Sequence, residues 1–434
     1  MSNQTKIGYK DILKQKEYLK IILASLVNRF GDSVDAVAYT WLVYELTGNA
    51  GWSALIFGLN RLPSILITPF AGAWVEGHKK KSVMVWTDII RAACVACIAT
   101  MYLLGALQPW VLVVTTLIIS TAEAYRGPAS TALTPQVLGR EYYEYGMSLL
   151  SSASTVVEIV GTAAAAGIIA IIGTSGAIYV DMFTFLLSAL IIVCVKKKEE
   201  NVVTSKFNAK EYTNTLKEGF NYVKENKCLV FFIGACIFLN AILVPFNSLQ
   251  APLVSEVLGA GAEVLSILGI ALMAGMFLGS VTYPMVREKV SGRVLFIFGG
   301  ICIGIYYIAL VACKPLYSNP ISIYILSAVL SIIFGYFITL LISYVQIEFV
   351  KQTDEKYLAR AASIMTAFSS AATPLTSFII SAIVLKVSTE NIFFIAGIMD
   401  VIGCTLLIFS STLKEQGCNT NPEISMNRQK GTSV

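Results

Sequence analysis

Residues 294–314, VLFIFGGICIGIYYIALVACK, decide the class of this protein. Twenty consecutive side chains, from Val294 to Cys313, are uncharged and mostly apolar, and Lys314 ends the run. A bilayer crossing needs roughly 20 such residues, because only a helix satisfies its own backbone hydrogen bonds inside hydrocarbon. The stretch therefore predicts a transmembrane helix.

The composition of the whole chain extends this prediction. Of its 434 residues, 56% are hydrophobic and only 14% are charged, and the mean hydropathy is +0.71. Soluble domains carry about 25% charged residues, so the natural solvent of this chain is lipid. The net charge of +5 does not indicate a nucleic-acid partner, because the basic residues lie in short loops between apolar runs.

The same pattern predicts twelve spans in two sets of six. The expected spans of the two sets are 19–46, 51–76, 82–105, 109–133, 146–171 and 174–196, and then 228–256, 263–286, 294–314, 320–348, 361–385 and 390–413. A polar stretch between Lys196 and Lys227 separates the sets. We therefore predict an all-α integral membrane protein made of two pseudo-symmetric six-helix bundles, the architecture of many secondary transporters.

These spans divide the chain into five parts. They are a segment 1–18, a bundle 19–196, a central loop 197–227, a second bundle 228–413 and a tail 414–434. The segment 1–18 is basic and lacks an apolar core, so we expect a lead-in and not a cleaved signal peptide.

Positive charges alternate from one side of the predicted bilayer to the other. One side carries Lys79, Lys80, Lys81, Arg140, the central loop, Arg287, Lys289, Arg293, Lys351 and Lys356. The opposite loops carry little beyond Lys314 and Lys386. By the positive-inside rule we expect a multi-pass protein of the cell membrane with both termini in the cytoplasm.

The first span carries a polar stripe in SLVNRFGDSVDAVAYTWLVYELTG, residues 25–48. Asn28, Asp32, Asp35 and Tyr39 recur at helical spacing, so they share one face of the helix. A charge at the bilayer centre costs roughly 2.5 to 3.5 kcal/mol, so such residues face the bundle interior and are functional candidates.

Other spans add charges of both signs. Arg29 lies in the first span, Arg61 in the second, Glu123 and Arg126 in the fourth and Glu158 in the fifth. With Asp32 and Asp35, the acids outnumber the arginines, so at least one carboxylate lacks a cation.

A carboxyl group without a cation in a low-dielectric cavity favours its protonated form, so it can bind a proton from one side and release it to the other. We therefore predict proton coupling, with Asp32 and Glu123 as the main acids and Arg29 and Arg126 tuning them. The alternative is that Arg29 with Asp32, and Glu123 with Arg126, are i,i+3 pairs within one helix that merely neutralise each other.

The second half has polar and aromatic side chains in place of deep charges. We expect these side chains, with Asn28, to line a cavity for a bulky amphipathic ligand: Asn240, Phe246, Asn247, Tyr336 and Gln346. Core packing is the alternative for each aromatic residue. In the third span, Asp88 and Arg91 are expected to form a structural or gating pair.

Enzyme chemistry has no support in the sequence. His78 is the single histidine, and most of the nine cysteines lie inside apolar spans. We therefore predict no metal site, no cofactor and no catalytic residues. A phosphate-binding loop is missing too, so ATP-driven transport is disfavoured.

A loop motif between the second and third spans resembles one in the major facilitator superfamily. Residues 72–81, GAWVEGHKKK, contain Gly72, Glu76, Lys80 and Lys81 where the motif has a glycine, an acidic residue and a basic cluster. Glutamate replaces the usual aspartate. The resemblance implies a gating loop that latches the two halves together in the outward-facing state.

Within that superfamily the chain is similar to the drug:proton antiporters that include macrolide efflux proteins. The likeness rests on GDSVDAVAYTWLVYELTGNAGWSAL (31–55), LPSILITPFAGAWVEG (62–77), RGPASTALTPQVL (126–138) and YVDMFTFLLSALII (179–192). The GPxxGG motif of many exporters is replaced by EIVGTAAAAGII (158–169), which lacks the proline.

These observations predict a monomeric secondary transporter for efflux of amphipathic drugs such as macrolides, driven by protons, whose two bundles rock about a central cavity. Its partners would be the substrate, protons and membrane lipid. Two alternatives are a dedicated exporter of one metabolite such as a siderophore, and an importer. A sensor or scaffold without transport is a different class, but the central loop and the tail are too short for a soluble module.

Overall fold

The computed structural model describes residues 9–139, 142–196, 220–317, 319–354 and 357–406. These residues form helices and connecting turns, and no strand occurs among them. Arg140, Lys356, the segment 1–8, most of the central loop and the tail from 407 onward, which entered the topology prediction, lie outside this description.

The first half contains one short helix and five long ones. They are α1 (Tyr9–Ile12), α2 (Lys16–Thr47), α3 (Ala50–Glu76), α4 (Lys80–Leu103), α5 (Pro109–Val137) and α6 (Tyr143–Val193). The second half contains α8 (Lys227–Ser248), α10 (Ala262–Lys289), α11 (Gly292–Ala312), α12 (Pro320–Gln352), α13 (Leu358–Ile383) and α14 (Thr389–Leu406). Between α8 and α10 lie α9 (Gln250–Pro252) and a π-helical turn η2 (Leu253–Val257), and η3 (Lys314–Leu316) is a 3₁₀ turn after α11.

Helix α6 accounts for two predicted spans. It runs without interruption apart from Gly173, whose backbone has φ 76° and ψ 173°. Only glycine adopts this conformation at little cost, so Gly173 lets the chain reverse direction where the two spans meet. The chain therefore crosses twice within one element.

Nine helices of the described residues are long and apolar enough to cross a membrane, and α6 is counted once among them. Helices α2 and α5 are of sufficient length but carry charged side chains inside the span, and these charges lower their hydropathy. With α2, α5 and both arms of α6, the twelve predicted spans are present. The prediction of an all-α membrane protein is confirmed.

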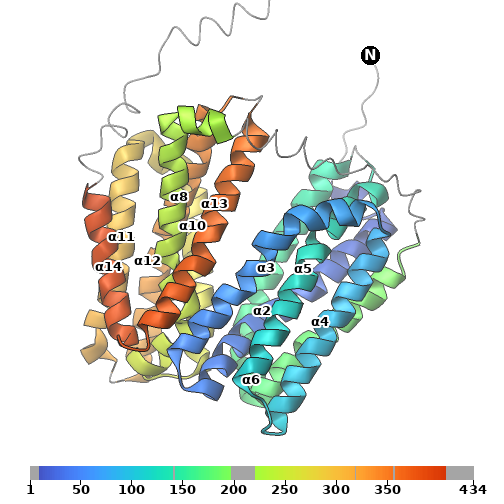
Figure 1. Cartoon of the computed structure of the whole chain (residues 1–434), viewed down its shortest axis with the longest axis horizontal. Helices are drawn as coiled ribbons and strands as arrows, with labels where there is room; N and C mark the ends of the chain where they lie inside the picture. The colour runs from blue at the N-terminus through green and yellow to red at the C-terminus, as the bar shows by residue number, and fades with distance from the viewer. Residues whose placement is uncertain (1–8, 140–141, 197–219, 318, 355–356, 407–434) are drawn as a thin grey trace, which may run out of the picture.

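The two halves repeat the same helix pairing (Figure 1). In the first half α2 packs on α6, α3 on α5, and α4 on both α5 and α6. In the second half α8 packs on α13, α10 on α12, and α11 on both α12 and α14. The halves also touch through equivalent helices, because α3 meets α13 and α6 meets α10. This repetition is the pseudo-symmetry that the spacing of the spans predicted.

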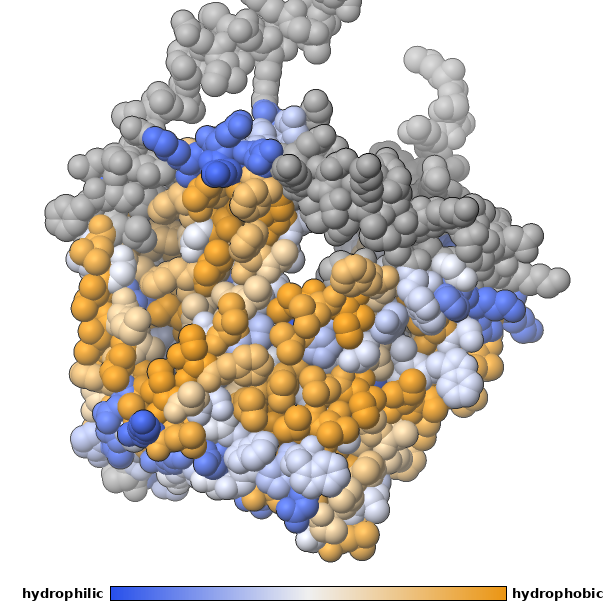
Figure 2. Space-filling view, in the orientation of Figure 1, coloured by the Kyte–Doolittle hydropathy of each residue, from blue (hydrophilic) through white to orange (hydrophobic). Residues whose placement is uncertain are grey.

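We call the end where α3 leads into α4 and α10 leads into α11 the basic end, because it carries Lys79, Arg287 and Lys289. The two halves touch at the opposite end. There Ser377 Oγ donates to Ala54 O at 2.5 Å, Ser381 Oγ donates to Gly51 O at 2.8 Å, and a shared apolar cluster spans both halves. At the basic end, none of the hydrogen bonds and ion pairs between side chains that the structure describes joins the two halves. Figure 2 shows open space between the halves toward this end, so the structure is open there and closed at the opposite end.

Helices α10 and α12 approach each other closely through glycine. A Cβ atom added at Gly275 would lie 2.0 Å from Ile332 O, and one at Gly335 would lie 2.2 Å from Leu272 O. Small residues permit such backbone contact, which in membranes stabilises helix association by dispersion.

We predict that Gly275→Ala lowers the free energy of unfolding by about 1 to 3 kcal/mol, because the added methyl group forces α10 and α12 apart. Denaturant titration of the purified protein measures the change. Gly234→Ala is the matched control, since nothing lies within 4 Å of a Cβ atom there. Equal effects of the two substitutions would show that the close contact does not stabilise the fold.

Candidate functional site

A polar cavity of about 360 Å³ lies in the first half and reaches α8 of the second. Its polar and charged lining residues are Arg29, Asp32, Asp35, Tyr39, Thr40, Ser53, Asn60, Arg61, Arg91, Glu123, Asp181, Asn247 and Ser248. The cavity therefore brings together side chains from α2, α3, α4, α5, α6 and α8.

Arg91 on α4 is the central cation of this cavity. Its Nη2 donates to Asp32 Oδ1 of α2 at 2.7 Å, and its guanidinium lies 4.0 Å from the centre of the Phe185 ring of α6. Arg91 is only 4% exposed. An arginine suits this place because its planar group can pair with a carboxylate and stack on an aromatic ring at once.

Two further carboxylates line the same cavity. Asp35 lies one turn after Asp32 on α2, and its Oδ1 is buried with no hydrogen-bond partner in the described structure. Asp181 on α6 is 1% exposed, and its Oδ1 accepts a hydrogen bond from Thr184 Oγ1 at 3.2 Å. Together with Asp32, three carboxylates thus line the cavity near the buried guanidinium of Arg91.

A second buried ion pair, between Arg126 and Asp88, lies next to the first on the side of the basic end. Arg126 Nε of α5 donates to Asp88 Oδ1 of α4 at 2.5 Å, and Ser188 Oγ of α6 donates to Asp88 Oδ2 at 2.8 Å. Asn28 of α2 contacts this pair, and with its amide turned its oxygen accepts from Arg126 Nη2 at 2.6 Å. Asp88 is fully buried. Four helices are therefore joined by one network of charge-assisted hydrogen bonds.

The ion pairs differ from those that the sequence suggested. Asp32 pairs with Arg91 and not with Arg29, and Arg126 pairs with Asp88 and not with Glu123. The interpretation of neutral i,i+3 pairs within one helix is therefore wrong. Asp88 and Arg91 do not pair with each other either, because each turns to a partner on a neighbouring helix.

The remaining predicted charges of the first half are more accessible. Arg29, Arg61 and Glu123 line the cavity, are exposed and form no ion pair in the described part of the chain. Arg61 lies 5.7 Å from the centre of the Phe57 ring. Glu158 on α6 is half-buried and is not part of the cavity lining.

The predicted residues of the second half separate into different environments. Asn247 is exposed and lines the cavity. Asn240 donates to Cys236 O within its own helix at 2.9 Å, and Gln346 is exposed near the end of α12. Tyr336 OH accepts from Thr282 Oγ1 at 3.2 Å.

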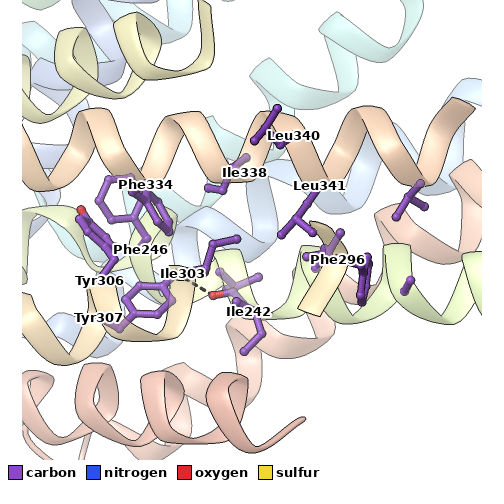
Figure 3. Packing of buried hydrophobic residues seen from close by; sticks show 14 of the residues in the cluster. Ile242, Phe246, Phe296, Ile303, Tyr306, Tyr307, Phe334, Ile338, Leu340 and Leu341 are labelled. Carbon is purple, nitrogen blue, oxygen red and sulfur yellow. Dashed lines mark hydrogen bonds between the residues drawn. The ribbon is translucent and has the colours of Figure 1, made fainter. Parts of the chain in front are cut away.

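Phe246 lies away from the cavity, in the core of the second half (Figure 3). It is 1% exposed, and its ring centre lies 5.1 Å from that of Phe334 and 5.9 Å from that of Tyr306. Nearby, Tyr307 OH donates to Ile242 O at 2.7 Å. The assignment of Phe246 to the substrate cavity is therefore not supported, and core packing explains this residue.

The predicted gating loop lies at the basic end. Gly72 has open space where a Cβ atom would lie, and Lys80 is buried. Lys81 Nζ donates to Val195 O at 2.6 Å, which is a contact within the first half. The structure describes the backbone of Glu76 but not its side chain, so the expected role of this acid lies outside the description.

Asp181 is the site residue that the sequence reasoning missed. It lies in YVDMFTFLLSALII, which carried the family resemblance but was not assigned to the site. An ionisable residue inside an apolar span is a functional candidate by default, and this rule would have found it. Thr184 and Ser188 follow Asp181 at helical spacing. Thr184 donates a hydrogen bond to Asp181, and Ser188 donates one to Asp88.

Among the described residues no three His, Cys, Asp or Glu side chains gather as metal ligands. The charged side chains that line the cavity are acids and arginines, and uncharged polar groups lie between them.

Comparison with known proteins assigns the chain to a family. The model of a family described as "Transmembrane secretion effector", a group of major facilitator transporters, matches residues 11–431, nearly the whole chain. The chain belongs to this family. It is a multi-pass membrane transporter of the major facilitator superfamily, as the loop motif and the spacing of the spans predicted.

Relatives of this transporter include efflux proteins. It is 26% identical to the uncharacterized MFS-type transporter YvqJ of Bacillus subtilis, over 68% of this chain and 70% of the relative. It is 24% identical to the multidrug efflux pump Tap of Mycobacterium tuberculosis, over 73% and 75%. It is 23% identical to macrolide efflux protein A of Streptococcus pyogenes, over 61% of this chain and 65% of that protein.

Solved structures share the fold at low identity. The nucleoside transporter NupG gives a TM-score of 0.73 at 12% identity, covering 90% of this transporter and 98% of that chain. A bacterial homologue of the iron transporter ferroportin in its inward-facing state gives 0.70 at 14% identity, covering 93% and 99%. At these identities the likeness concerns the fold alone.

Proposed function

We propose that this transporter exports amphipathic compounds, drugs such as macrolides among them, across the cytoplasmic membrane in exchange for protons. The observation that carries the proposal is the cluster of Asp32, Asp35 and Asp181 about the buried guanidinium of Arg91. The names of the efflux relatives support the substrate class.

The cluster can bind a proton because its charges do not balance. One guanidinium neutralises one carboxylate, and a further buried carboxylate left ionised costs several kcal/mol. A proton on Asp35 or Asp181 removes that cost. When the proton leaves, the new anion competes with Asp32 for Arg91, so the ion pairs between α2, α4 and α6 rearrange.

The substrate would meet this cluster in the same cavity. Asn247 and Ser248 of α8 line the same cavity as the acids, so a bound compound would contact both halves. A substrate that neutralises or displaces an acid competes with the proton, and such competition is the basis of exchange.

The open end fits the export direction. By the positive-inside rule the basic end faces the cytoplasm, so the structure is open to compounds from the cytoplasm. Rocking of the two halves would close this end and separate Ala54 from Ser377 at the other. The loop with Lys80 and Lys81 would then latch across the halves, whereas here Lys81 contacts its own half.

We predict that Asp35→Asn reduces transport driven by a pH gradient at least tenfold, because the uncharged amide can neither bind nor release the coupling proton. Uptake of a fluorescent macrolide or dye into everted vesicles, with and without an imposed gradient, measures this. Exchange of labelled for unlabelled substrate at equal pH should continue, which shows that the variant still folds and binds.

Glu390→Gln is the matched control, since this carboxylate is exposed and pairs with Lys314 outside the cavity. Its transport should stay within twofold of the unmodified protein. Full dependence on the gradient in Asp35→Asn would rule out Asp35 as the coupling acid. Transport of one endogenous metabolite, with no response to macrolides or dyes in the same vesicles, would favour the dedicated exporter.

A further inference from the structure

A second, larger hollow lies on the outer surface of the first half. It has a volume of about 920 Å³ and is formed by the end of α3, the start of α4 and the middle of α5. We call it the outer groove. It shares no lining residue with the polar cavity, so the two are separate.

The walls of the outer groove are apolar and open to the surroundings. Trp86 and Ile90 of α4 are 62% and 41% exposed, and Ile118 of α5 is 41% exposed. Figure 2 shows a broad apolar surface over the helices of this face. Because these side chains lie within membrane spans, the groove faces acyl chains and not water.

The mouth of the outer groove, at the basic end, is polar and positive. His78, Lys79 and Ser82 line it there. Lys79 is exposed and forms no ion pair in the described part of the chain. His78 stacks on Trp74 at 3.7 Å between ring centres, and its Nδ1 lies 2.7 Å from Trp74 O. The aromatic pair thus marks the level where indole rings meet lipid headgroups.

We propose that the outer groove is a binding site for one anionic phospholipid of the leaflet at the basic end. An acyl chain would lie between Trp86, Ile90 and Ile118, and the phosphate would reach Lys79 and the hydroxyl of Ser82. The charge at the mouth selects the headgroup, because a lysine near the surface attracts anionic lipid over zwitterionic lipid. The apolar walls hold the chain through buried area.

Such a lipid would lie beside the ion-pair network. Thr87 lines the groove directly before Asp88, which pairs with Arg126 on the inner side of the same helices. Occupancy would therefore stabilise the packing of α4 against α5 in the open state. The site does not depend on proton coupling, so the failure of one proposal leaves the other intact.

The test uses tryptophan fluorescence of the full chain in lipid nanodiscs. Brominated acyl chains quench indole fluorescence on contact, and the chain has five tryptophans, among them Trp74 and Trp86 in the groove. Brominated phosphatidylglycerol is compared with brominated phosphatidylcholine at equal low mole fraction. We expect half-maximal quenching at about fivefold less of the anionic lipid, the ratio that one lysine supplies near a membrane surface.

Four variants assign the effect. Lys79→Gln should remove the fivefold difference, whereas Lys289→Gln should keep it, since Lys289 is the exposed lysine at the corresponding end of α10. Trp86→Phe should remove most of the lipid-specific quenching. Trp110→Phe should leave it, because Trp110 is exposed at the other end of the spans.

Two results would overturn the proposal. One is equal quenching by the two lipids, which would mean that the groove holds only bulk lipid. The other is quenching that is independent of the headgroup but relieved by added macrolide, which would make the groove a substrate path. Gel filtration and denaturant titration of Lys79→Gln confirm that the variant is folded.

Discussion

Asp88→Asn is expected to lower the free energy of unfolding by about 3 to 5 kcal/mol, because it leaves the Arg126 guanidinium inside the protein without its anion. Asp88 is fully buried, and the Arg126 side chain is 13% exposed. Asparagine has nearly the same volume, so the loss reports charge and not a cavity. Denaturant titration of the purified protein in detergent measures it.

The matched control is Glu348→Gln. Glu348 pairs with Arg287 at 3.4 Å and with Lys351 at 3.2 Å in a more exposed setting at the basic end. Removing this charge should cost less than about 1 kcal/mol. The double variant Asp88→Asn, Arg126→Gln should be more stable than the sum of the two single changes predicts, since the partners are coupled. Strict additivity would show that the pair does not act as a unit.

Arg91→Lys is expected to reduce transport at least tenfold although the charge is kept. The lysine ammonium is a point charge, so it cannot hold Asp32 at 2.7 Å and stack on Phe185 at the same time. A weakened pair of this kind costs about 2 kcal/mol or more, and each 1.4 kcal/mol is a factor of ten. Initial uptake rates in everted vesicles measure the loss.

Arg61→Lys serves as the control because Arg61 lines the same cavity but is exposed and forms no ion pair among the described residues. Its transport should remain within about threefold, as for an exposed charge. A normal rate in Arg91→Lys would mean that Arg91 acts only through its charge. The stacking on Phe185 would then have no part in transport.

Much of the fold could be predicted because each span depends on local composition. A run of twenty uncharged, mostly apolar residues such as 294–313 favours lipid over water. Within lipid it forms a helix, because a helix satisfies its own backbone hydrogen bonds. The meeting of two spans at Gly173 follows from the same local reasoning, since a glycine lies between two apolar runs. Pseudo-symmetry then follows from two sets of six spans.

The site was predicted in part. The stripe of Asp32 and Asp35 does face a cavity, because helical periodicity alone places both on one side of α2. Phe246 was misplaced, since an aromatic residue in a span serves equally well in a core or in a cavity. Asp181 was passed over because most of the span around it is apolar, although Thr184 and Ser188 follow it at helical spacing.

The sequence by itself determined that this chain lies in a membrane, how often it crosses and which spans carry charge, since these properties depend on residues close together in the chain. Only the tertiary structure decided that Asp32 pairs with Arg91 and Arg126 with Asp88, and that Asp35 Oδ1 has no hydrogen-bond partner among the described residues. Ion pairs between helices depend on how each helix is rotated against its neighbours. That rotation is set by packing contacts such as those of Gly275, which join residues far apart in the sequence.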